Sequence, residues 1–259
     1  MFERLQKPFL TVETGEAYQP IRLTYDIFQA EEAAIALNQL KCCEPSGTNT
    51  WNWFWRDECA GLHFESIDAF KKKVDAPLRL ATLVIRDHKL YVNLPSFKRA
   101  CLAVPFFHRL IKPENARIRT ADFINKVFGL DERLPHGFSE LFKEDELDTI
   151  VRQRISDYEE VQERCETATS PEEALVILAE YTQKEAQKRL PYAERYDFEH
   201  SNSSSQDPDV MFLGFYIFLR GRELVAIRRW FGRTGYTLAD AADETMEQVF
   251  GDMNIDIIE

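Results

Sequence analysis

The chain has 259 residues, of which 44% are hydrophobic, so it can build a sizeable core in one large domain or two small ones. Lys and Arg number 32 against 44 Asp and Glu, and the resulting net charge of −12 disfavours a general affinity for nucleic acid or for anionic membranes. The sequence contains no apolar run of about 18 residues, so we expect no membrane span, and its N-terminal segment lacks the apolar core of a signal peptide. The five cysteines are irregularly spaced, which favours reduced thiols over disulfides. We therefore expect a cytoplasmic protein.

The first part of the chain predicts a strand, a helix and a second strand in succession. Residues 21–27 alternate apolar and polar side chains, as a half-buried strand does. Residues 30–40 are strong helix formers. The turn-forming sequence Pro-Ser-Gly at 45–47 then separates this helix from the next strand.

The second strand carries three of the four tryptophans of the chain. If residues 51–56 are extended, Trp51, Trp53 and Trp55 share one face, and we call these three residues the tryptophan ladder. Three indoles on one face could form a platform for a planar ligand or for apolar side chains of a partner. Large aromatic side chains more often fill cores, so the competing interpretation packs the ladder beneath helices of the same domain.

Residues 57–135 predict a hairpin with short helices on either side. Strands over 79–85 and 89–94 are separated by the turn sequence Arg-Asp-His. Three short helices are predicted from residues that can cap them. One covers 67–74 after Ser66, and one begins at Ser96 and is limited by Pro105 and Pro113. The third is bracketed by Thr120 as its cap and Gly129 as its end. Residues 1–135 therefore predict a mixed α+β part.

Residues 140–190 have the pattern of two antiparallel helices. Apolar side chains recur at helical spacings from Leu147 to Cys165, with charged residues between them. Ser170 and Glu173 form a capping box, with Pro171 at the first helical position. We expect a helical hairpin over 136–192 and then a flexible polar loop over 193–210.

Residues 211–259 predict a second hairpin followed by a helix. Two runs, 211–219 and 224–231, flank the sequence Arg-Gly-Arg-Glu and are apolar on both faces, as central strands are. Thr237 can cap a final helix over 238–250. Such strands need a sheet to pair with, so we expect them to complete the sheet of the N-terminal part in one integrated domain.

The second predicted hairpin is the locally basic region of an acidic chain. It contains what we call the arginine cluster: Arg220, Arg222, Arg228, Arg229, Trp230 and Arg233. Guanidinium groups suit carboxylates, phosphates and aromatic faces, so the cluster is a candidate site for an acidic ligand or partner. The competing interpretation pairs these arginines with surplus acids of the chain itself.

Catalytic and metal-binding patterns in the sequence are weak. Cys59 and His63 are four residues apart, but no Cys-x-x-Cys knuckle accompanies them, and we expect no metal and no cofactor. Asp87 and Lys89 have the order seen at metal-dependent nuclease sites, although a hairpin tip favours Asp for reasons of turn geometry alone. The sequence has neither a Gly-rich phosphate loop nor Gly-x-Ser-x-Gly.

Together these patterns predict an α+β fold, with a mainly antiparallel sheet of about five to seven strands, packed helices and an inserted αα-hairpin. For function we expect a non-catalytic binding protein, such as an assembly factor, adaptor or regulator. It would engage a protein partner or an acidic ligand through the tryptophan ladder and the arginine cluster. Two alternatives stay open: a metal-dependent phosphodiesterase or nuclease that uses Asp87 and Lys89, and a sensor that binds a planar small molecule on the tryptophan face.

Overall fold

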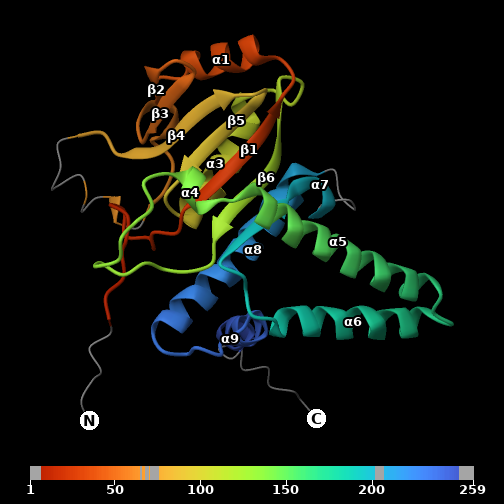
Figure 1. Ribbon diagram of the computed structural model, residues 1–259. Coiled ribbons are helices and arrows are strands. Elements are labelled where there is room, and N and C mark those ends of the chain that lie inside the picture. The colour runs from red at the N-terminus through yellow and green to blue at the C-terminus, as the bar shows by residue number, and fades with distance from the viewer. Residues whose placement is uncertain (1–6, 65, 68–69, 71–75, 202–206, 251–259) are drawn as a thin grey trace, which may run out of the picture.

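The centre of the molecule is an antiparallel β-sheet. The computed structural model describes residues 7–64, 66–67, 70, 76–201 and 207–250. Within them, seven strands pair in the order β2-β3-β4-β5-β1-β6-β7 (Figure 1). The strands are β1 (Ile21–Ile27), β2 (Cys43–Gly47), β3 (Thr50–Phe54), β4 (Arg79–Arg86), β5 (Lys89–Leu94), β6 (Ala116–Ile124) and β7 (Ala193–Asp197). The predicted α+β class with a mainly antiparallel sheet is confirmed.

Helices cover one face of this sheet. Leu23, Val92, Leu83 and Trp51 lie in register across β1, β5, β4 and β3, so their side chains share that face. The covering helices are α1 (Ala30–Gln39), α3 (Phe97–Leu110) and α8 (Pro208–Trp230) (Figure 1). Their apolar side chains and the strand row form one continuous core.

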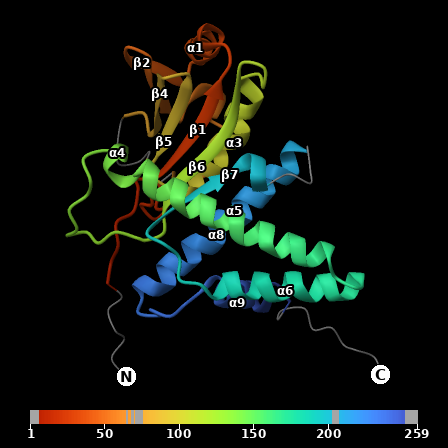
Figure 2. The ribbon, with the colours of Figure 1, turned by 45° about the vertical axis from the view of Figure 1, so that its right-hand side comes forward.

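The predicted αα-hairpin is also confirmed. After the short helix α4 (Phe138–Leu141), α5 (Glu144–Glu166) and α6 (Pro171–Gln187) run antiparallel and extend away from the sheet (Figure 2). Ser170 caps α6 by accepting a hydrogen bond from the backbone N–H of Glu173 at 3.2 Å. Arg195 of β7 ties the base of the hairpin to the sheet, because it donates at 2.6 Å both to Asp122 of β6 and to Glu144 of α5.

The hairpin predicted around residues 86–88 is formed by β4 and β5. Asp87 and His88 occupy the turn with φ angles of 53° and 58°, the left-handed values that a tight hairpin turn requires. Ser96 caps α3 as predicted, with its side chain accepting a backbone hydrogen bond at 3.3 Å. Pro105 lies inside α3 instead of limiting it. The helix predicted over 67–74 lies largely outside the described residues.

The short helix predicted between Thr120 and Gly129 is wrong. Thr120 lies within β6, where it pairs with Thr24 of β1 on one side and with Asp197 of β7 on the other. A threonine before a short apolar stretch can cap a helix or continue a strand, and local sequence does not separate the two. Thr120 is in a strand because the backbone on both of its sides pairs with a neighbouring strand.

The second hairpin, predicted from the runs 211–219 and 224–231, is also wrong. Both runs belong to the single helix α8, and the supposed turn at Arg220, Gly221 and Arg222 is helical. A run that is apolar on both faces is compatible with a buried helix as well as with a central strand. The missed signal was the start of the helix, where Asp207 caps and Pro208 takes the first position.

The part of the chain before α8 differs from the predicted flexible loop as well. Residues 193–197 form β7, the strand that extends the sheet in place of the expected C-terminal hairpin. Residues 198–201 form the short helix α7 (Phe198–Ser201), and residues 202–206 lie outside the described part. The predicted final helix is confirmed as α9 (Leu238–Phe250), which packs against α8 and α6.

Candidate functional site

The tryptophan ladder belongs to the core of the protein. Trp51 and Trp53 are only 4% and 0% exposed. The Trp51 indole N–H donates to Asn38 of α1 at 2.8 Å, which places α1 over this end of the ladder. The Trp53 ring packs against Phe106 and Phe107 of α3, with centroids 5.1 and 5.0 Å away. Trp55 is half-buried and donates to the Leu62 carbonyl at 2.9 Å.

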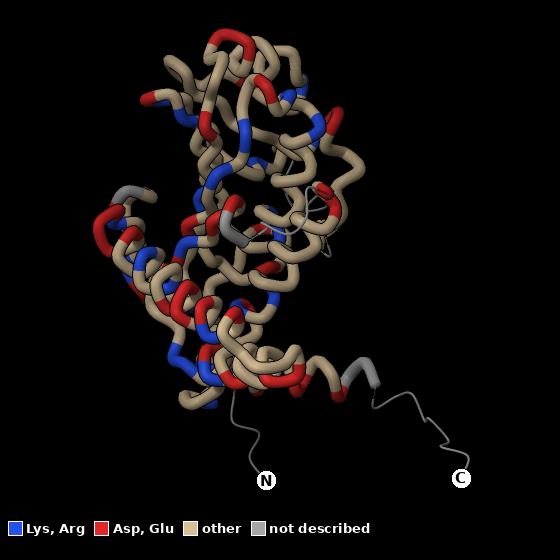
Figure 3. The backbone as a smooth tube through the Cα atoms, turned by 90° about the vertical axis from the view of Figure 1, so that its right-hand side faces the viewer, with Lys and Arg blue, Asp and Glu red and all other residues tan. Residues whose placement is uncertain are grey.

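Most of the arginine cluster is engaged by acids of the same chain. The helix α8 turns these side chains to different sides. Arg222 is buried against Glu194, Arg220 pairs with Glu223, and both Arg228 and Arg233 pair with Glu244. Basic and acidic positions are intermingled in the lower half of the molecule (Figure 3).

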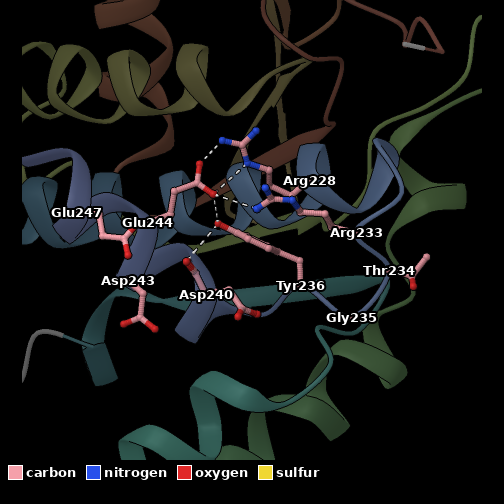
Figure 4. Close-up of a pocket in the computed structure, with 9 residues that line it drawn as sticks. All are labelled: Arg228, Arg233, Thr234, Gly235, Tyr236, Asp240, Asp243, Glu244 and Glu247. Carbon is pink, nitrogen blue, oxygen red and sulfur yellow. Dashed lines mark hydrogen bonds and ion pairs between the residues drawn. The ribbon is translucent and has the colours of Figure 1, made fainter. Parts of the chain in front are cut away.

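Arg228 and Arg233 line a cavity of about 610 Å³ between the end of α8 and α9 (Figure 4). Glu244 lies between the two guanidinium groups and also accepts a hydrogen bond from the Tyr236 hydroxyl at 2.8 Å. Asp240, Asp243 and Glu247 are also among the lining residues. Because the acids outnumber the cations here, this cavity is poorly suited to an anionic ligand.

Arg229 and Trp230 line a second cavity, of about 660 Å³, which we call the basic pocket. It lies where the last turn of α8 meets the ends of β6 and β7. Its lining consists of Asn125, Lys126 and Val127 after β6, Arg189, Leu190, Pro191 and Tyr192 before β7, and Ala226, Arg229 and Trp230 of α8.

Backbone pairing continues past the sheet and places the two strand ends side by side at this pocket. The Asn125 backbone N–H donates to the Tyr192 carbonyl at 2.9 Å. The Asn125 side-chain amide donates to the Pro191 carbonyl at 3.0 Å. These hydrogen bonds fix the backbone of residues 191–192, so the segment that carries Arg189 is attached to the end of β6.

The floor of the basic pocket is apolar. Val127 and Ala226 are almost completely buried and pack together beneath Trp230. The Trp230 indole N–H donates to the Lys7 carbonyl at 2.6 Å, which restrains the ring at the edge of the pocket. An apolar floor with a few convergent polar groups at the rim is typical of binding sites.

The rim of the basic pocket is positively charged. Arg189 has no ion pair or hydrogen bond partner in the described part of the chain, and no Asp or Glu is among the described lining residues. Among the described residues, Arg229 donates only from its Nε, to the Tyr236 carbonyl at 2.8 Å, and its two terminal nitrogens have no partner there. Burial and the neighbouring charge of Arg189 lower the pKa of Arg229. An anion between the two guanidinium groups would relieve this repulsion.

The third cation of the rim is partly neutralised. Lys126 forms an ion pair with Glu132, which also accepts a hydrogen bond from the Gly129 N–H at 3.2 Å. Arg189 and Arg229 therefore carry most of the uncompensated charge. Of the predicted site residues, the structure brings only Arg229 and Trp230 together at this pocket.

A buried ionic network supports the pocket from below. Glu194 of β7 is 0% exposed and receives two hydrogen bonds from Arg222, both at 2.9 Å. It also pairs with Arg154 of α5 and accepts a hydrogen bond from Asn125 at 2.6 Å. Through this carboxylate the sheet, the αα-hairpin, α8 and the pocket wall are connected.

The network predicts a loss of stability in acid. Burial disfavours the Glu194 carboxylate, but Arg222, Arg154 and Asn125 outweigh burial and lower its pKa to about 2. A depressed carboxyl pKa stabilises the fold above the unfolded-state value of about 4.3, by about 3 kcal/mol at neutral pH. That contribution should disappear as the pH falls from about 4.5 through about 2. Arg222 stays charged throughout, because a guanidinium does not titrate in this range.

Urea unfolding of the parent protein and of Glu194→Gln, measured at intervals across this pH window, isolates the contribution of this carboxyl group. The parent should lose more stability on acidification than the variant, since the variant has no carboxyl group to protonate at this position. Equal pH slopes for the two proteins would show that folding does not lower the pKa of Glu194.

The residues considered for catalysis or metal binding lie elsewhere. Asp87 and Lys89 are at the exposed end of the β4–β5 hairpin, and Asp87 pairs with Arg86 at 3.2 Å. Cys59 is buried, whereas His63 is exposed. The described residues contain no group of three or more His, Cys, Asp or Glu side chains arranged to hold a metal ion. Nor has any helix among them the combined length and apolar character needed to cross a membrane.

Comparison with known proteins finds no match to this chain among protein-family models, curated proteins or solved structures. Reasoning from the sequence missed Lys126, Arg189 and Tyr192, which lie far from α8 in the chain. The available signal was local: Arg189 stands just after a confirmed helix and immediately before an apolar, aromatic turn.

Proposed function

We propose that this protein is a non-catalytic binding protein that holds an anionic group in the basic pocket. The observation that carries the proposal is the pair of guanidinium groups, Arg189 and Arg229, at the rim of an apolar cavity without a carboxylate among its described lining residues. The cluster arginines elsewhere on α8 are paired with acids of the chain. Arg189 has no acidic partner among the described residues, although the protein has a net charge of −12. This favours binding of an anion that comes from outside the chain.

The size and composition of the pocket support the same function. A volume of about 660 Å³ is within the range of small-ligand sites and can also accept a side chain of a partner. Guanidinium groups bind carboxylate and phosphate oxygens with two parallel hydrogen bonds, which are stronger than bonds between neutral groups. The described lining residues include no Ser, Thr, Cys, His, Asp or Glu, and the lysine among them, Lys126, is paired with Glu132, which favours binding over catalysis.

Inorganic pyrophosphate is a suitable first probe, titrated at low salt by calorimetry against the parent protein and Arg189→Ala. Removal of Arg189 should weaken binding about tenfold to a hundredfold, the usual effect of losing one or two hydrogen bonds from a charged donor. Because Arg189 is exposed and without a partner in the described residues, its replacement should leave the melting temperature unchanged.

Arg152→Ala is the matched control, because Arg152 is exposed on α5, lies outside the pocket lining and carries the same charge. If both variants weaken pyrophosphate binding equally, the effect is one of net charge and the basic pocket is not the site. If the parent binds no pyrophosphate at low salt, the proposed function is wrong.

A further inference from the structure

Three exposed apolar residues, one in the lining of the basic pocket and two next in the chain to residues at its edge, form what we call its border. Leu130 is 63% exposed, Tyr192 53% and Phe231 38%. Tyr192 lines the pocket and Phe231 directly follows Trp230. Leu130 directly follows Gly129 in the chain. The Gly129 backbone lies next to the Trp230 ring, because a Cβ added at Gly129 would be 3.2 Å from that ring. Clusters of exposed apolar groups around a polar site are typical of protein interaction surfaces.

This border extends the recognition surface beyond the cavity. The Phe231 ring contacts Phe9, with ring centroids 6.0 Å apart, and is 38% exposed to solvent. A small anion would occupy the rim of the cavity and leave Leu130 and Phe231 uncovered. A ligand that covers them must be extended, with apolar groups on either side of its negative charge.

The lining lacks the residue type that commonly recognises the sugar of a nucleotide. In dinucleotide sites an Asp or Glu carboxylate binds the ribose hydroxyl. No Asp, Glu, Ser, Thr or Gln is among the described lining residues. The side-chain nitrogen of Asn125 is already bonded to Pro191 and to Glu194.

We propose, on the basis of the proposed function, that the occupant of the basic pocket is an acidic segment of a partner protein in which aliphatic or aromatic side chains alternate with Asp and Glu. Its carboxylates pair with Arg189 and Arg229, and its apolar side chains cover Leu130, Tyr192 and Phe231. The rest of an acidic chain repels such a segment, so electrostatic complementarity restricts it to this surface.

The test uses a fluorescent octapeptide that alternates Glu with Leu and Phe, with binding followed by fluorescence anisotropy. Two further peptides separate the contributions: one with Gln in place of every Glu, and one made of Glu alone. The mixed peptide should bind about tenfold more tightly than either, because each lacks one of the two complementary features.

Leu130→Ser provides the decisive variant, since Leu130 is exposed and borders the pocket without contributing charge. It should weaken the mixed peptide several-fold and leave pyrophosphate binding unchanged. Leu178→Ser is its control, because Leu178 is an exposed leucine on α6 that is outside the pocket lining. This variant should bind both probes like the parent protein.

The outcomes distinguish the two proposals. If pyrophosphate binds but the mixed peptide binds no better than the all-Glu peptide, or Leu130→Ser has no effect on it, the peptide proposal is wrong and the proposed function stands. If a nucleoside diphosphate displaces pyrophosphate more effectively than the mixed peptide does, the ligand is a nucleotide and the peptide proposal is also wrong. If neither pyrophosphate nor the peptide binds, both proposals fail.

Discussion

Arg222→Met should lower the free energy of unfolding by about 3–5 kcal/mol, the usual cost of removing one partner from a buried ion pair. Glu194 is completely buried and both of its oxygens accept hydrogen bonds from Arg222. Without that guanidinium the carboxylate keeps Arg154 and Asn125 but loses its buried countercharge. Methionine preserves much of the apolar volume, so the loss reports on charge.

Urea denaturation followed by circular dichroism at neutral pH measures this effect. Arg220→Met is the matched control, because Arg220 lies on the same helix but is exposed and paired with Glu223 at the surface. Its replacement should cost less than about 1 kcal/mol. Equal losses for the two variants would mean that the buried pair contributes no more than a surface pair, and the account of this network would have to be abandoned.

Trp53→Ala should also destabilise the protein by about 3–5 kcal/mol, the usual range for truncating a large buried aromatic side chain. Its ring is fully buried between the sheet and α3, in contact with Phe106 and Phe107. The indole N–H also donates to the Cys59 sulfur at 2.7 Å, so the substitution leaves a cavity and removes a buried contact.

The same measurement on Trp55→Ala gives the comparison within the ladder. Trp55 is only half-buried, at the edge of the core, so its truncation should cost clearly less. A Trp53→Ala variant that is as stable as Trp55→Ala would contradict the assignment of the ladder to the core. It would also reopen its interpretation as a ligand platform.

Several local features followed from sequence because their signals are short-range. The caps at Ser96 and Ser170, the turn at Asp87 and His88 and the apolar periodicity of α5 depend on residues within a few positions of one another. The structure confirms each of them.

Two of the wrong assignments arose where local signals were ambiguous. The run 211–219 is apolar on every side, a pattern that a buried helix and a central strand share, and packing against α3 and the rest of the core stabilises the helix. Thr120 became part of a strand because β1 and β7 lie on either side of it. Both decisions depend on partners distant in the chain.

The candidate site shows the same limit. The sequence identified α8 as basic and aromatic, but it could not say which of its arginines would meet an acid. Arg222 forms an ion pair with Glu194, and Arg228 forms one with Glu244. Arg229, in contrast, lies at the same pocket as another cation, Arg189.

By itself the sequence determined the α+β class, the helical hairpin, the acidic surface and the caps and turns, because composition and short-range periodicity encode them. Only the tertiary structure decided the strand order, the burial of the tryptophan ladder and the position of the basic pocket. These features depend on pairs such as Asn125 with Tyr192 and Arg189 with Arg229, which are distant in sequence. Such contacts form only when the whole chain buries its core, and no local pattern records them.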